Sequence, residues 1–173
     1  MKFDLNRSIE ILSNTPSVLE SLLHNLSSDW LHANEGPDTW SPYDIVGHLV
    51  HGEQTDWMER TNIILFSDDK HFRKFDRFAQ FTESKGKTIH VLLAEFRKLR
   101  EKNIEHVKSL QLTEDKLNMT GIHPSFGEVT LRQLLSTWAV HDLNHIAQIC
   151  RVLAKQYKPE TGPWVEYLPL LTK

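Results

Sequence analysis

The spacing of apolar residues is the feature that most constrains the fold of this chain. Apolar residues recur every three or four positions in four long stretches, 3–27, 41–65, 84–110 and 130–155, whereas the alternation typical of β-strands is scarce. This spacing puts the apolar side chains on one stripe of each helix, and each stripe needs a partner to cover it. The sequence therefore predicts an all-α protein in which four amphipathic helices form a four-helix bundle.

Two proline positions predict where helices begin. Thr15-Pro16 and Ser41-Pro42 each pair a capping residue with a proline, which is favoured at the first helical position. We therefore expect the first stretch to consist of a short leading turn and a main helix that starts at Pro16. The second stretch is expected to start at Pro42.

The connections predict how the helices are ordered. Residues 66–83 form a charged and aromatic connection with room for a short helix. This long crossover between the second and third helices would set those two helices parallel. Residues 111–130 are expected to form a loop. The proline-rich tail is expected to pack back on the bundle through its large apolar residues, Trp164, Tyr167, Leu168 and Leu170.

Length and composition exclude several classes of protein. A chain of 173 residues suits one domain over 1–173, and no apolar run approaches the ~18–20 residues of a membrane-spanning helix. The formal net charge of −3 argues against a nucleic-acid-binding protein, which usually carries a basic excess. The single cysteine, Cys150, and the lack of a signal peptide predict a cytoplasmic protein.

The fourth helical stretch carries two histidines at core positions. Its buried seam runs Leu131, Leu134, Trp138, His141, His145, Gln148 and Val152, and the chain has ten histidines, an unusually high number. His141 and His145 are four residues apart, so both imidazoles project from one face and can reach one metal ion. The alternative is a pair of buried structural histidines bonded to polar neighbours. Burying two imidazoles without partners would cost on the order of 1–3 kcal/mol each, which favours the metal site.

A third ligand is needed, and His48 is the leading candidate. It lies at the edge of the apolar stripe of the second helix, whereas His51 lies further from that stripe and is the weaker choice. Glu53 lies within the stripe, where a carboxylate is rarely tolerated without a partner. It is a candidate ligand, a candidate base behind the ligands, or the partner of a buried arginine such as Arg60. We favour the ion pair.

Four further residues are candidates for the surroundings of the site. Asp142 and Asn144 flank the two histidines and could orient their imidazoles, although ordinary surface polarity explains them equally well. Trp138 and Gln148 lie one turn to either side and are candidates to line a pocket, although a simple core position explains Trp138 better. The remaining histidines are expected at the surface or its boundary.

The segment His141-Asp142-Leu143-Asn144-His145 also has the frame of the zincin protease motif. Asp142 replaces the glutamate that serves as general base in that motif, and it is one methylene shorter. The zincin helix also lies beside a sheet, which this sequence does not predict. A zincin-like protease is therefore the lesser alternative.

Several motifs together resemble the DinB/YfiT-like superfamily of metalloenzymes. The segments WSPYDIVGHL (40–49) and HPSFGEVTLRQLLSTWAVHDLNHIAQICRVL (123–153) carry the resemblance. TPSVLESLLHNL (15–26) and GPWVEYLPLL (162–171) fit the same pattern, so the resemblance covers nearly the whole chain. The combination of the W-S-P…H-L entry with H-x-x-x-H is more specific than either motif alone.

The resemblance implies a four-helix bundle with a long crossover, assembled as a homodimer. It also implies a divalent metal held by His48, His141 and His145, with Zn, Ni, Fe and Mn all compatible with imidazole ligands. Family members act on small molecules, either as transferases or isomerases that use a low-molecular-weight thiol or as metal-dependent hydrolases. The alternative from a different class is a non-catalytic metal-binding or stress-response scaffold.

Overall fold

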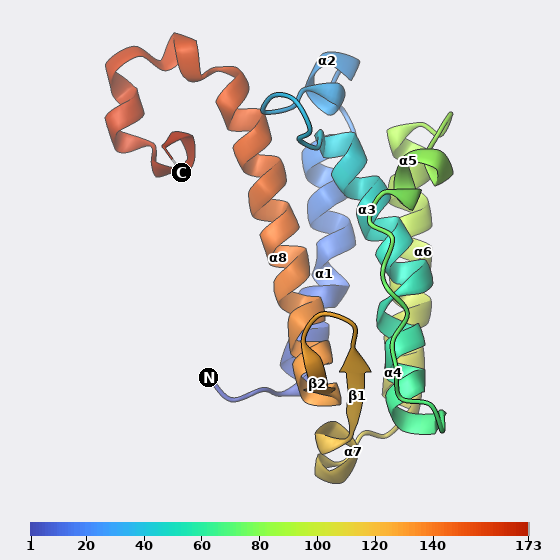
Figure 1. Ribbon diagram of the computed structural model, residues 1–173. Helices are drawn as coiled ribbons and strands as arrows, with labels where there is room; N and C mark the ends of the chain where they lie inside the picture. The colour runs from blue at the N-terminus through green and yellow to red at the C-terminus, as the bar shows by residue number, and fades with distance from the viewer. Residues whose placement is uncertain (173) are drawn as a thin grey trace.

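The computed structural model describes residues 1–172 and consists mainly of helices. Four helical segments run the length of the molecule, and each packs against two of the others (Figure 1). The all-α four-helix bundle predicted from the sequence is confirmed. The segments are α1 (Leu5–Leu23), α3 (Pro42–Thr55) continued by α4 (Trp57–Phe66), α6 (Ile89–Ser109) and α8 (Leu131–Gln156).

The long crossover gives the bundle its topology. After α4 the chain runs back along the bundle and forms the short helix α5 (Ala79–Glu83) before α6 begins. The segments α3–α4 and α6 therefore run in the same direction, as predicted, while α1 and α8 run in the opposite direction (Figure 1).

The first helix differs from the prediction at Pro16. The helix α1 begins after the cap Asp4, whose side chain accepts from Arg7 N, and continues through Pro16 without a break. A proline inside a helix leaves the carbonyl four residues earlier without its usual donor. Here that carbonyl is Leu12 O, and it accepts a hydrogen bond from Arg100 Nη1 at 2.9 Å. A tertiary contact therefore offsets part of the cost that local sequence rules assign to Pro16.

The second helical stretch is broken where the sequence predicted one helix. It starts as predicted, with a capping box between Ser41 and Asp44, but α3 ends at Thr55 and Asp56 separates it from α4. Near this break the Glu53 carbonyl accepts from Asn103 Nδ2 at 2.8 Å. A contact from α6 thus helps satisfy the backbone polar groups where the helix is interrupted.

Residues 111–130 contain more structure than the predicted loop. They hold the short helix α7 (Glu114–Asn118) and an antiparallel hairpin of β1 (Thr120–His123) and β2 (Gly127–Thr130). A further short helix, α2 (Ser28–His32), precedes α3. None of the described helices is long and apolar enough to cross a membrane.

The tail does not pack as predicted. It forms two 3₁₀ segments, η1 (Lys158–Tyr167) and η2 (Pro169–Leu171), and curls away from α8 before returning to it (Figure 1). The four residues expected to cover the bundle remain exposed, with Trp164 at 69% and Tyr167 at 76%. Leu171 is the tail residue that is buried, because the return of the chain brings it against α8.

The core consists of two apolar clusters separated along the bundle by polar residues. Along α3 and α4, one cluster ends at Val50 and the other begins at Trp57. Along α8, the second cluster ends at Ala139 and the first begins again at Ile149. The intervals on these helices contain the buried polar residues Glu53, Asp142 and His145, and the corresponding interval of α6 contains Arg100 and Asn103. Apolar packing thus encloses a polar layer near the middle of the bundle.

Candidate metal centre

Three imidazoles converge in this polar layer. His48 comes from α3, while His141 and His145 come from α8, which packs against it. His141 Nε2 lies 3.2 Å from His48 Nε2 and 3.1 Å from His145 Nε2. One ring nitrogen from each residue lies within 4.8 Å of the others. The structure thus brings together the three residues that were predicted as metal ligands.

Local sequence signals position the helices that carry these rings. Ser41 caps α3 from the residue before Pro42, and Thr130 caps α8 through a box with Gln133. These caps determine where each helix starts, and the apolar stripe of each helix determines which of its residues face inward. The spacing of four between His141 and His145 then places both rings on the inner face of α8.

Hydrogen bonding shows how one imidazole is oriented. His145 Nδ1 lies 2.9 Å from Gln148 Oε1, so this nitrogen carries the proton and donates to the amide oxygen. The Nε2 atom of His145 is then unprotonated and faces the other two rings. The Nδ1 atoms of His48 and His141 are buried and have no hydrogen-bond partner among residues 1–172.

Burial keeps the three imidazoles neutral. Burial, together with the neighbouring histidines, lowers the pKa of His48 to about 3 and the pKa of His141 to about 2. Burial also lowers the pKa of His145, partly opposed by its hydrogen bond to Gln148. A neutral imidazole is the form that binds metal ions, so the site needs no deprotonation at neutral pH.

The nitrogen spacing fits a single divalent ion. Two nitrogens bound to one tetrahedral zinc lie about 3.3 Å apart, since each Zn–N bond is about 2.0–2.1 Å long. The observed separations of 3.1 and 3.2 Å are close to this value. Three neutral imidazoles carry three N–H protons on six ring nitrogens, and with the His145 proton on Nδ1 its Nε2 presents a lone pair to the other two rings. The donor set and its spacing therefore suit a metal ion.

Aromatic rings surround the three imidazoles. The ring of Trp40 lies 4.8 Å from that of His48, and Phe75 from the crossover packs edge-on to His48 at 5.6 Å. Trp57 packs edge-on to His141 at 5.1 Å. These rings limit the access of water to the site.

The crossover approaches α3 closely next to His48. A Cβ atom on Gly47 would lie 2.5 Å from Ser84 Oγ and 2.7 Å from Gln80 Oε1, so only glycine leaves room for α5 at this position. The Tyr43 hydroxyl, 2.6 Å from the Ser84 carbonyl oxygen, also connects α3 to the end of the crossover. The crossover is thereby held over the site.

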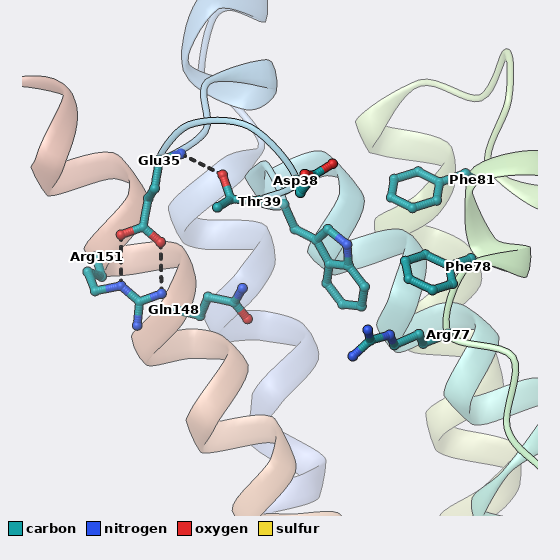
Figure 2. Close-up of a pocket in the computed structure, with 9 residues that line it drawn as sticks. Glu35, Asp38, Thr39, Arg77, Phe78, Phe81, Gln148 and Arg151 are labelled. Atoms are coloured by element: carbon teal, nitrogen blue, oxygen red, sulfur yellow. Dashed lines mark hydrogen bonds and ion pairs between the residues drawn. The ribbon is translucent and has the colours of Figure 1, made fainter.

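A cavity of about 590 Å³ opens near the three imidazoles, although none of them lines it. Two of its lining residues contact the histidines directly, since Trp40 packs on His48 and Gln148 accepts from His145. Figure 2 shows Gln148 and Arg151 on one side of the cavity and Arg77, Phe78 and Phe81 on the other. A small molecule in this cavity would lie next to the candidate metal site.

Glu53 and Asp142 belong to a second buried polar cluster. Arg100 Nη2 lies 2.9 Å from Glu53 Oε1 and 2.9 Å from Asp142 Oδ1, and all three side chains are buried. Trp138 Nε1 donates to Glu53 Oε1 at 2.8 Å, and Asn103 Nδ2 donates to Glu53 Oε2 at 2.9 Å. The expectation that Glu53 forms a buried ion pair agrees with this geometry.

Several expected roles differ in the structure. The partner of Glu53 is Arg100, because Arg60 instead pairs with Asp56 at 2.6 Å. Asp142 faces Arg100, and its recorded hydrogen bonds connect it to that residue rather than to an imidazole. Trp138 does not line the cavity and lies in the core at 1% exposure, which is the position that the sequence favoured.

Asn144 does not orient a histidine and fits the alternative of ordinary surface polarity. Its side chain is exposed and forms no hydrogen bond with another described residue, so it does not orient an imidazole.

The position of Asp142 opposes the zincin interpretation. Asp142 occupies the position of the zincin base, but its carboxylate is fully buried against Arg100 and cannot reach a substrate.

Sequence reasoning missed three residues that matter to these sites. Arg100 follows Phe96 by four positions on the apolar stripe of α6, and this spacing was a usable signal for burial. Trp40 is the first residue of the W-S-P motif and directly precedes the cap of α3, and this position was the available signal. Arg77 lies in the crossover, where no periodicity indicates the direction of a side chain.

Comparisons with known proteins agree on the architecture. The sequence model of the DinB superfamily matches residues 11–149. The solved structure of YfiT from Bacillus subtilis, described as a probable metal-dependent hydrolase with an unusual four-helix bundle topology, superposes with a TM-score of 0.76. That match has 19% sequence identity and covers 90% of this chain and 89% of YfiT, and it supports the fold alone. The search of curated proteins gave no significant match.

Proposed function

This chain belongs to the DinB superfamily, and we propose that it is a metal-dependent hydrolase whose divalent ion is held by His48, His141 and His145. The observation that carries the proposal is the convergence of three neutral imidazoles, those of His48 and His145 buried and that of His141 half-buried, close to a cavity lined by their neighbours Trp40 and Gln148. Three protein ligands leave coordination positions free, which is the pattern of catalytic sites rather than structural ones. YfiT, the structural neighbour, is itself described as a probable metal-dependent hydrolase.

The ligand set suits zinc, nickel, iron or manganese, since imidazole binds all four. When bound, the ion supplies Lewis acidity, which lowers the pKa of a coordinated water molecule to about 7. The residues of the chain have supporting roles. Gln148 holds the proton of His145 on Nδ1, which leaves Nε2 free to bind. Trp40, Phe75 and Trp57 enclose the imidazoles, and the cavity beside Gln148 admits the substrate.

The first test measures metal content. Untagged protein, purified without added metal, is analysed by elemental mass spectrometry together with His141→Ala. We expect about one divalent ion per chain in the wild type and its loss in the variant. His51→Ala is the matched control, because His51 is a buried histidine on α3 whose Nδ1 bonds to Glu83 instead of facing the cluster. Metal retained by His141→Ala, or none taken up by the wild type from zinc or nickel, would refute the proposed site.

The second test separates the possible reactions of a metal-loaded protein. Panels of esters and amides are assayed with and without a low-molecular-weight thiol. Turnover without thiol supports the hydrolase. Turnover that requires thiol would replace it with the S-transferase or isomerase activity implied by the family resemblance. A metal-replete protein with no turnover in either panel would favour the non-catalytic scaffold.

The homodimer implied by the resemblance remains a separate prediction. Exposed apolar side chains on α1 and α8 support it, including Val18 at 42%, Val140 at 62% and Leu143 at 48%. Burial of such residues between two copies would stabilise a dimer. Sedimentation equilibrium distinguishes a dimer from a monomer.

A further inference from the structure

The charged side chains around the cavity near the histidines differ in whether they have an ion-pair partner. On one wall, Arg151 pairs with Glu35 through two hydrogen bonds of 2.9 and 2.8 Å, and Lys155 reaches the same carboxylate at 2.7 Å. These side chains satisfy one another. Their mutual pairing leaves little capacity for binding an additional ligand.

Arg77 on the opposite wall differs from this group. No carboxylate of residues 1–172 forms a recorded ion pair with it, and its guanidinium carbon lies 4.8 Å from the centroid of the Phe78 ring. Stacking on an aromatic face fixes the plane of a guanidinium and leaves its edge N–H groups free to donate. Arg77, an exposed residue at the cavity, is therefore a guanidinium without a carboxylate partner among the described residues.

The surroundings of Arg77 restrict the type of ligand. Phe78 and Phe81 form a stacked pair on the same wall, with ring centroids 6.3 Å apart, and Trp40 lies edge-on to Phe81 at the same distance. Asp38 also lines the cavity, and Figure 2 shows it well separated from Arg77. Arg151 and Lys155 are both paired with Glu35, so Arg77 is the one guanidinium of the cavity lining without a carboxylate partner within residues 1–172, and one such group suits a singly charged anion better than a doubly charged phosphate.

We propose that this cavity binds a substrate with an apolar or aromatic body and a single carboxylate, and that Arg77 holds the carboxylate. The inference rests on the proposed function, because it identifies the substrate class of the same site. Arg77 would donate to the carboxylate in a charge-assisted, bidentate arrangement. Phe78, Phe81 and Trp40 would contact the apolar body, while Gln148 marks the end of the cavity next to the histidines.

The test compares two probes that differ in charge but have nearly the same shape. Binding of 3-phenylpropionate and of 3-phenylpropionamide is measured by isothermal titration calorimetry on zinc-loaded protein. We expect the acid to bind about tenfold more tightly than the amide, because one charge-assisted contact is lost in the amide. Arg77→Gln should abolish this preference. Arg73→Gln is the matched control, since Arg73 is also an exposed arginine of the crossover but does not line the cavity and faces Glu59 at 3.8 Å.

The His141→Ala variant separates Arg77 from the metal as the carboxylate-binding group. If Arg77 holds the carboxylate, the acid preference survives in His141→Ala. If the preference instead survives in Arg77→Gln and disappears in His141→Ala, the carboxylate binds at the histidines. That result would overturn this inference and support the metal site. Equal binding of the two probes, or no binding of the acid up to about 10 mM, would also overturn it.

Discussion

Two polar clusters lie next to each other in the middle of this bundle and differ in how many of their polar atoms have hydrogen-bond partners. The histidine cluster consists of His48, His141 and His145, and the arginine cluster consists of Arg100, Glu53 and Asp142. Both use α3 and α8, and Asp142 directly follows His141 in the sequence. The arginine cluster adds one side chain from α6.

The clusters differ in how far they satisfy their own polar groups. In the arginine cluster both carboxylates are hydrogen-bonded, and of the buried side-chain nitrogen and oxygen atoms of this cluster only Arg100 Nε has no hydrogen-bond partner among residues 1–172. Arg100 also bonds to Leu12 O, so one side chain connects α6 to α1, α3 and α8. In the histidine cluster two Nδ1 atoms lack partners and the Nε2 atoms face one another. A self-satisfied cluster holds helices together, whereas an incomplete one is suited to bind a cation.

The largest effect is expected from breaking the arginine cluster. Arg100→Met leaves two carboxylates buried without a counter-charge and should lower the free energy of unfolding by about 3–5 kcal/mol, measured by urea denaturation. Arg97→Met is the control on the same helix, because its partner Glu20 is 49% exposed. Loss of such a surface pair should cost less than about 1 kcal/mol. Equal losses in the two variants would contradict the proposed structural role of the arginine cluster.

The next effect is stabilisation by metal. Zinc at about 100 times its dissociation constant should raise the free energy of unfolding of the wild type by about 2.7 kcal/mol, because the folded protein presents the assembled ligands. His141→Ala should show no such increase, whereas Arg97→Met should show all of it. Zinc-dependent stabilisation in His141→Ala would place the metal elsewhere.

A pH titration of metal-free protein tests whether the histidines are buried in the neutral form. The folded pKa of His141, about 2, lies below its ordinary value of 6.5, so the unfolded chain binds more protons between these limits. The stability due to His141 is therefore present above pH 6.5 and is lost as the pH falls. From pH 7 to pH 5 the wild type should lose about 2 kcal/mol more than His141→Ala. Asp56, whose pKa burial raises to about 6, has the opposite effect, but it is present in both proteins and cancels in the comparison.

If the two proteins lose equal stability over this range, His141 is not buried as a neutral imidazole. Circular dichroism at each pH, with urea as denaturant, gives the required free energies. In that case His141 would bind protons equally in the folded and unfolded protein, as an exposed histidine does.

The smallest effect concerns the orientation of His145. Gln148→Leu removes the acceptor of the Nδ1 proton and should weaken zinc binding about tenfold, measured by competition with a chromogenic chelator. Gln156→Leu is the control, since Gln156 lies further along α8 and donates to the carbonyls of Asn34 and Val152. Unchanged affinity in Gln148→Leu would show that packing alone orients the ring.

The sequence by itself determined the elements and the inward faces that the structure shows. Periodic apolar residues predicted four long helical segments, and the length of the crossover predicted that α3 and α6 run parallel. The spacing of His141 and His145 predicted that they share a face, and the position of His48 placed it near them. These features depend on residues a few positions apart, and helical geometry converts such spacing directly into direction.

Only the tertiary structure decided which polar groups meet across the bundle. Glu53 pairs with Arg100 instead of Arg60, Asp142 contacts the same arginine, and Arg100 donates to Leu12 O, which offsets part of the cost of Pro16 inside α1. Arg100 is 88 residues from Leu12 and 42 from Asp142 in the sequence. No local rule relates residues so far apart, because their meeting depends on how whole helices pack and on which buried charges must be neutralised together.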